Sequence, residues 1–86
     1  MRPTACPIWG TPAQEQPKKG DKREIISSRA GERYAISGRV EAMLAHRPLD
    51  DRERELLTDW IAGEHREGKK CPLISSYVLV AVIGKG

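Results

Sequence analysis

The chain has 86 residues, of which 38% are hydrophobic and 31% are charged, a composition typical of small globular domains. A chain of this length folds around one small hydrophobic core, which excludes large multidomain enzymes, and we expect a single domain over residues 1–86. Fifteen Lys and Arg against 12 Asp and Glu give a net charge of +3. Residues 1–38 hold seven basic and four acidic side chains, whereas residues 39–86 hold eight of each, so the basic excess belongs to the N-terminal part.

The N-terminus and the longest apolar stretch both favour a cytoplasmic protein. Residues 1–7 contain no apolar segment of the kind found in signal peptides. The apolar stretch 73–83 is interrupted by two serines and is too short to cross a bilayer, which takes about 20 residues. Cys6 and Cys71 could form one disulfide, but two thiols are the better interpretation in a reducing compartment. We therefore expect no contact with a membrane.

The N-terminal part of the chain predicts a loop followed by a β-hairpin. Residues 10–22 combine Pro, Gly and charged residues without apolar periodicity, which is typical of a loop. The β-prone segments 23–28 and 33–37 follow, and the short connection 29–32 contains a glycine. This pattern favours two antiparallel strands.

Two helices are predicted between residues 38 and 67. The first begins after Ser37, a suitable N-cap, and ends before Pro48. The second, over residues 51–67, begins after the N-cap Asp50, has an acidic first turn and ends at a glycine. Each helix carries an apolar stripe at helical spacing. The stripe of the first consists of Val40, Met43 and Leu44, and that of the second of Leu56, Leu57, Trp60 and Ile61.

The last segment, Tyr77–Ile83, is a continuous apolar run rich in β-branched residues, and it predicts a C-terminal strand within residues 73–83. The fold class is then α+β, with a hairpin, two helices and a C-terminal strand. A hairpin and two short helices can cover only one face of this strand. We therefore expect Tyr77–Ile83 to meet a second copy of the chain or another protein, since an exposed apolar strand is a template for pairing.

Two five-residue segments that end in glycine form a faint internal repeat, Cys6-Pro7-Ile8-Trp9-Gly10 and Ser27-Ser28-Arg29-Ala30-Gly31. With Tyr34 and Ile36 after the second segment, residues 6–37 resemble a zinc ribbon, in which C-P-x-C-G and C-P-R-C-G knuckles supply four thiolates to one zinc ion. The resemblance is to the N-terminal ribbon-like modules of some bacterial proteins.

The resemblance places Cys6, Trp9, Ser27 and Ala30 at the four ligand positions. Of these, Cys6 alone is a good zinc ligand. The resemblance therefore implies a degenerate ribbon, in which the hairpin architecture remains, the metal has been lost and the indole of Trp9 fills the vacated centre.

The remaining residues predict no metal site, cofactor or catalytic site. The serines at 27, 28, 75 and 76 lack the sequence of a nucleophile elbow, and a helix N-terminus explains the carboxylates at 50–55. Residues 82–86 end in glycines but lack the spacing of a phosphate-binding loop. The Cys and His residues also lack the paired spacings of zinc sites. They are Cys6, Cys71, His46 and His65.

Two functions remain open on these observations. The first is a non-enzymatic accessory or protein-interaction module derived from a zinc ribbon. The alternative is a nucleic-acid-binding module that uses the basic N-terminal half to contact phosphates. The candidate contacts for this alternative are Lys18, Lys19, Lys22, Arg29 and Arg33.

Overall fold

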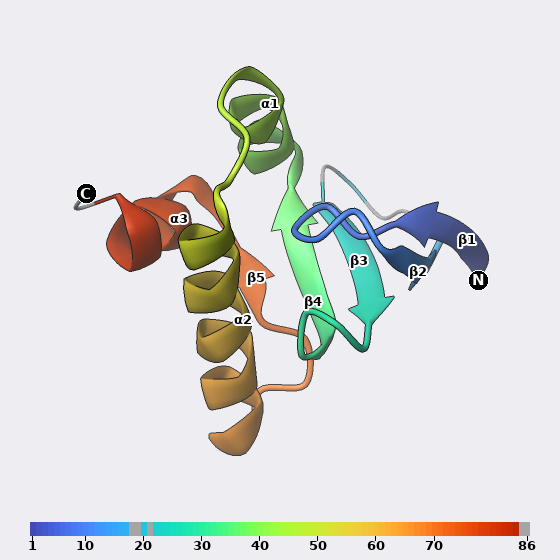
Figure 1. Cartoon of the computed structure of the whole chain (residues 1–86). Coiled ribbons are helices and arrows are strands. Elements are labelled where there is room, and N and C mark those ends of the chain that lie inside the picture. Colours follow the sequence, from blue (N-terminus) through green and yellow to red (C-terminus); the bar gives the residue numbers. More distant parts are fainter. Residues whose placement is uncertain (18–19, 21, 85–86) are drawn as a thin grey trace.

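The computed structural model describes residues 1–17, 20 and 22–84, and these form a mixed sheet with three helices. The strands lie in the sheet in chain order (Figure 1). The first four form an antiparallel meander, whereas the last joins its neighbour in parallel. The strands are β1 (Arg2–Ala5), β2 (Pro12–Glu15), β3 (Lys22–Ser27), β4 (Glu32–Ser37) and β5 (Leu73–Ile74). The predicted α+β class is confirmed, and so is the hairpin, which is formed by β3 and β4.

The helices are α1 (Gly38–His46), α2 (Asp51–Arg66) and α3 (Ser76–Ile83). The N-caps predicted for α1 and α2 are present: the Ser37 hydroxyl accepts a hydrogen bond from the backbone N–H of Val40. Asp50 and Glu53 bond reciprocally to each other's backbone N–H groups as a capping box. These local signals explain why both predicted helices are confirmed to within one residue.

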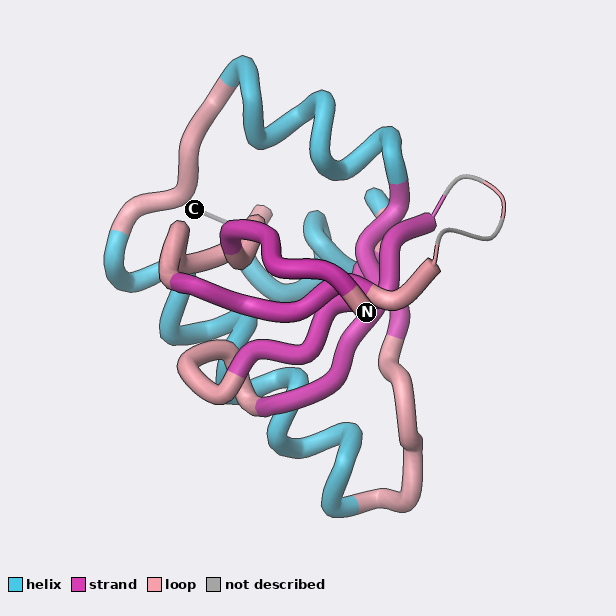
Figure 2. Tube along the Cα trace, turned by 90° about the vertical axis from the view of Figure 1, so that its right-hand side faces the viewer, coloured by secondary structure: helices cyan, strands magenta, loops and turns pink. Residues whose placement is uncertain are grey.

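The hydrophobic core lies between the sheet and the helices, which gather at the β4–β5 side of the sheet (Figure 1). Figure 2, viewed from the β1 side, places the N-terminal strands in front of the helices. Tyr34 and Ile36 of β4 are fully buried, and so are Leu57 and Ile61 from the predicted stripe of α2. None of the helices in the described ranges is long and apolar enough to span a membrane.

The loop predicted over residues 10–22 is wrong for residues 12–15, which form β2. Every second side chain of this strand, Ala13 and Glu15, is buried. A small residue and a charged one do not form a recognisable apolar alternation. Glu15 can be buried because Arg23 of β3 donates to both of its carboxylate oxygens, at 3.0 and 3.1 Å, and a buried charge needs such a partner.

The C-terminal strand predicted over residues 73–83 is also wrong, because strand β5 ends at Ile74 and Tyr77–Ile83 lies in helix α3. The Ser75 hydroxyl accepts a hydrogen bond from the backbone N–H of Val78 and caps the helix. Leu79 and Ile83, one turn apart, are buried. An unbroken apolar run fits a buried helix as well as a buried strand. Pairing through a free strand edge at these residues is therefore excluded.

Candidate interaction surface

Helix α3 has two apolar faces, and the fold covers only one of them. Leu79 and Ile83 pack into the core, whereas Tyr77 is 84% exposed and Val80 is 53% exposed. No charged residue occurs between Ser76 and Ile83. A helix that is apolar all round is normally buried on all sides. The outward face of α3 therefore has the composition of a buried surface.

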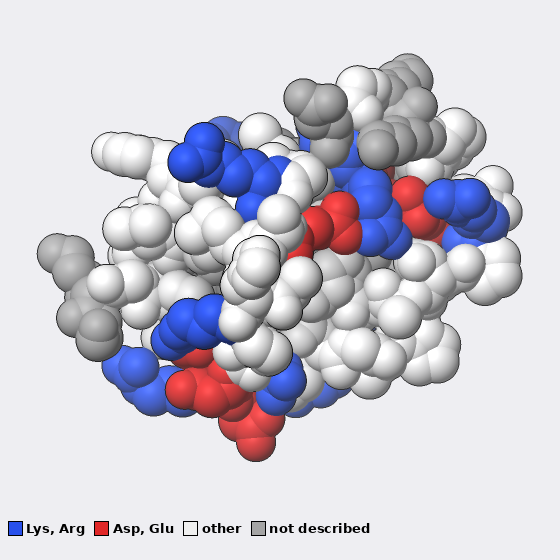
Figure 3. Space-filling model, turned by 90° about the horizontal axis from the view of Figure 1, so that it is seen from above, with Lys and Arg blue, Asp and Glu red and all other residues white. Residues whose placement is uncertain are grey.

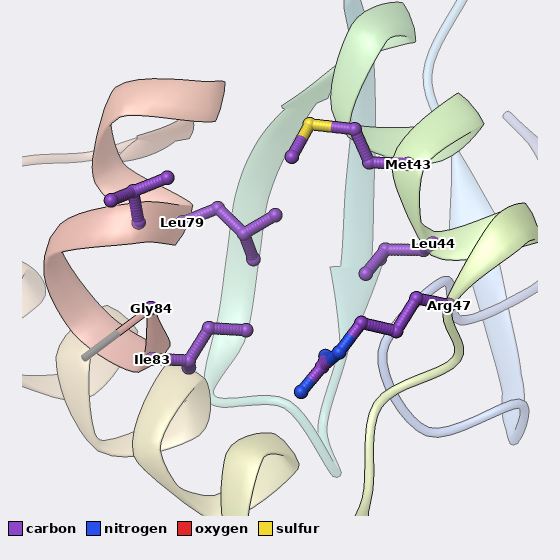
Figure 4. A pocket seen from close by; sticks show the side chains of 7 residues that line it. Met43, Leu44, Arg47, Leu79, Ile83 and Gly84 are labelled. Atoms are coloured by element: carbon purple, nitrogen blue, oxygen red, sulfur yellow. The ribbon is translucent and has the colours of Figure 1, made fainter. Parts of the chain in front are cut away.

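A groove runs between α1 and α3, beside this outward face (Figure 4). Met43 and Leu44 line it from α1, while Leu79 and Ile83 line it from α3, and the groove encloses about 260 Å³. Val80, Gly84 and Arg47 complete its border. Apart from the guanidinium of Arg47, the side chains of this lining are apolar, so the groove is suited to bind an apolar group.

Arg47 is held at the border of the groove by Glu53 of α2. Its Nη2 donates to Glu53 Oε2 at 2.6 Å, and its Nη1 donates to Oε1 at 3.2 Å. The pKa of Glu53 lies below its usual value because of these hydrogen bonds and the one from the backbone N–H of Asp50. The Arg47 side chain is still 67% exposed. A guanidinium has five N–H donors, so Arg47 can donate to a further group while it stays bound to Glu53.

Helix α3 brings no charged side chain to the surface between Ser76 and Ile83. Figure 3, seen from above, shows white surface between separate groups of Lys and Arg side chains. Acidic side chains gather at its lower border, next to basic ones. Docking at this surface therefore removes little charge from water, which lowers its cost.

The positions that resemble zinc ligands lie in two turns, one between β1 and β2 and the other between β3 and β4. Cys6 is buried, and its Sγ shares a hydrogen bond of 3.2 Å with the hydroxyl of Tyr34. Burial of that hydroxyl raises the pKa of Tyr34. Ser27 and Ala30 are also buried, and the Ser27 hydroxyl accepts from the backbone N–H of Ala30 at 3.2 Å. The Cys6 and Ser27 side chains thus bond to protein groups. Whether this segment is a degenerate ribbon stays a prediction.

The glycine that ends the second turn has a packing role. Gly31 has a φ of +95°, and a Cβ at this position would lie 3.2 Å from Cγ2 of Ile61. The glycine therefore lets the β3–β4 turn approach α2 closely.

Trp9 connects the first turn to α2. Its Nε1 donates a hydrogen bond of 2.9 Å to Thr58 Oγ1. The guanidinium carbon of Arg29 lies 3.4 Å from the centre of the indole ring, which is a cation–π contact. Trp9 is partly buried and packs against the core. Trp9 therefore joins both turns and the second helix.

The basic residues proposed as phosphate contacts lie along the β3–β4 hairpin in the described part of the chain. Lys22 begins β3 and Arg29 follows its end, so the two are roughly 20 Å apart along the strand. Arg29 also lies against Trp9 and 3.9 Å from Glu55. Arg33 lies on β4, opposite Ile26. Lys18 and Lys19 lie outside the described residues.

The cysteines and histidines are separate from one another. Cys6 and Cys71 are free thiols, as expected. His65 Nε2 donates a hydrogen bond of 2.7 Å to the carbonyl oxygen of Arg33, a contact that the sequence does not indicate. His46 lies in the last turn of α1. Within residues 1–17, 20 and 22–84, no three His, Cys, Asp or Glu side chains are grouped as metal ligands would be.

Comparison of the chain with protein-family models, with curated proteins and with solved structures finds no match.

Proposed function

We propose that the protein is a non-enzymatic protein-interaction module that docks through the outward face of α3. The observation that carries the proposal is the 84% exposure of Tyr77 on a helix without a polar face. Full burial of a large apolar side chain contributes about 1.5 to 3 kcal/mol. Tyrosine is also enriched at protein interfaces, where its ring is buried and its hydroxyl finds a hydrogen-bond partner.

The groove supports binding rather than chemical conversion. Of the described residues that line it, Arg47 alone is ionisable, and its guanidinium is bound to Glu53. An arginine stays protonated at physiological pH, so it can orient a polar group but does not act as an acid or base. The surface therefore combines apolar anchoring with one fixed hydrogen-bond donor, the usual composition of a docking site.

We also propose that residues 6–37 derive from a zinc ribbon and that the protein acts in the cytoplasm. The first proposal is supported by the two glycine-ended turns at the ends of neighbouring hairpins. The second is supported by the two free thiols, since cytosolic proteins rarely form stable disulfides.

A photo-crosslinking experiment tests the docking role. Tyr77 is replaced by p-azidophenylalanine, which has nearly the same shape, in cells that make the protein. Irradiation should give one discrete crosslinked product, because the side chain lies within a specific interface. The matched control carries the same residue at Gln14, which is exposed on β2. A product from position 14 only, or no discrete product from position 77 either in cells or with purified protein near millimolar concentration, would contradict the proposal.

A further inference from the structure

We propose, building on the docking role of α3 proposed above, that its partner is a second copy of this chain. Two α3 helices pack antiparallel across a twofold axis, and Tyr77 of each copy enters the groove between α1 and α3 of the other. A twofold interface uses the same surface on both copies, so this surface must carry both a projecting group and a place that receives it.

The groove runs along α3 from Leu79 to Gly84, so its far end and Tyr77 lie at opposite ends of the helix. Tyr77 is in the first turn of α3, whereas Ile83 and Gly84 border the groove at its last turn. The point midway between Val80 and Ala81 is equally far from Tyr77 and Gly84. An antiparallel crossing at this point therefore sets each tyrosine opposite Gly84 of the other copy, which has no side chain of its own.

The groove fits a phenol ring in size and chemistry. It encloses about 260 Å³, and a closed apolar cavity of about 150 Å³ already accepts benzene. Met43, Leu79 and Ile83 offer apolar contacts to the ring (Figure 4). Arg47 at the border has free N–H donors for the oxygen of the tyrosine hydroxyl, which needs a partner once it is buried.

The charge distribution also suits a second copy. Each chain carries a net charge of +3, so two copies repel each other weakly overall. Helix α3 carries no charged side chain, and contact through it adds little to this repulsion. The antiparallel arrangement also sets the helix dipoles in opposite directions. Ala81 is small, so the two backbones can approach at the crossing.

The interface is small, so we expect weak self-association. Stable complexes bury about 800 Å² on each partner, which is more than one face of a helix of eight residues and its groove provide. Sedimentation equilibrium of the full chain should therefore show a monomer at low micromolar concentration that becomes a dimer toward the millimolar range.

Substitution of Tyr77 tests the contact. Tyr77→Ala should weaken self-association at least about tenfold, because a central aromatic anchor is lost. Gln14→Ala, on exposed β2, should leave it unchanged. In wild-type protein the NMR signal of the Met43 methyl group should shift with concentration, and in Tyr77→Ala it should not. Circular dichroism verifies that both variants are folded.

A charge swap at Val80 tests the twofold symmetry. Val80→Glu and Val80→Lys should each remain monomeric, because each sets like charges next to the axis, and an equal mixture of the two should dimerise. A monomer at every concentration, or a wild-type dimer that Tyr77→Ala does not weaken, would overturn the second copy as partner. If the chain is monomeric but position 77 crosslinks to a different protein, the docking role holds and this partner is wrong.

Discussion

The N-terminal strands and the C-terminal helix differ in which side chains they bury: the strands bury polar ones, whereas the helix leaves apolar ones exposed. Around β1–β4, the buried side chains of Glu15 and Cys6 are paired, Glu15 with Arg23 and Cys6 with Tyr34. At α3, apolar side chains are exposed on a helix with no polar residue after its first turn. The first region is stabilised by contacts within the chain, whereas the second leaves an apolar face uncovered, which we propose is covered by association.

The centre of the N-terminal region is Arg23. Its guanidinium bonds to Glu15 on β2, to Thr4 on β1 at 3.0 Å and to Glu41 on α1. One side chain thus connects β3 with two strands and a helix. Hydrogen bonds from Arg23 hold the pKa of Glu15 below its usual range, so Glu15 stays ionised despite its burial.

The two tyrosines give the sharpest test of this contrast. Tyr34 is fully buried and Tyr77 is 84% exposed. Tyr34→Ala should lower the free energy of unfolding by about 3 to 5 kcal/mol, as for other buried aromatic residues, and a domain this small has little more than that. Tyr77→Ala should change it by less than about 0.5 kcal/mol. Urea denaturation at low micromolar concentration measures both, and equal effects would show that the contrast is wrong.

The next largest effect is expected at Arg23. Arg23→Ala leaves the Glu15 carboxylate buried without its main partner, and loss of one member of a buried pair costs about 3 to 5 kcal/mol. Arg2 is a matched control because it also bonds to Glu15, at 3.5 Å, but is 75% exposed. Arg2→Ala should cost less than about 1 kcal/mol. Thermal unfolding followed by circular dichroism separates the two, and a larger loss for Arg2→Ala would assign the role of central partner to that residue.

Acid should weaken the fold through Glu15 and Glu53. Both carboxyl groups have a folded-state pKa below the ordinary value of 4.5, because arginines hydrogen-bond to them. Their contribution to stability is therefore present above the ordinary pKa and is lost as the pH falls through the lower folded-state pKa. Urea midpoints should fall from about pH 5 to pH 3. The variant Glu53→Gln should be less stable at neutral pH, and its urea midpoint should fall less between pH 5 and pH 3. An unchanged fall of the midpoint would show that Glu53 does not contribute to the acid sensitivity.

Elements with local signals could be predicted from the sequence. Helix α2 has a capping box at Asp50 and Glu53 and an apolar stripe, and each signal lies within one or two turns of chain. Strand β2 has no such signal, because its burial depends on the pairing of Glu15 with Arg23 on the next strand. The segment Tyr77–Ile83 was predicted as a strand but forms helix α3, since an apolar run without periodicity fits both a helix and a strand. Its one deciding feature is the capping serine, Ser75.

The candidate site could be predicted only in part. The unbroken apolar composition of Tyr77–Ile83 marks this segment as one that needs cover on every side, whatever its secondary structure. The groove has no counterpart in the sequence, because Met43 and Ile83 are distant in the chain and come together only when α3 folds back beside α1. The position of the Arg47 side chain likewise depends on a hydrogen bond to Glu53 of α2, which the sequence does not indicate.

A gel-shift assay at increasing salt concentration tests the alternative function, a nucleic-acid-binding module. Lys22 and Arg29 lie roughly 20 Å apart along β3, and Arg29 already contacts Trp9 and Glu55, so binding to duplex DNA in a gel-shift assay should be weak even at low salt. Contacts to phosphates release counterions, so whatever binding occurs should fall steeply as salt rises. Tight binding that Arg33→Ala and Lys22→Ala both weaken would favour the alternative.

The smallest expected effect concerns metal. Elemental analysis of the purified protein should show no stoichiometric zinc, and a chelator should leave the unfolding temperature unchanged, because an indole and a methyl group stand at two of the ligand positions and a serine at a third. One zinc ion per chain would contradict the degenerate ribbon.

The combined change Trp9→Cys, Ser27→Cys and Ala30→Cys supplies the missing thiolates. If the two turns still have ribbon geometry, this variant should take up one zinc ion and gain stability with it, since metal binding to a folded site contributes directly to folding. Folded variant protein that binds no zinc would show that the turns resemble knuckles in sequence only.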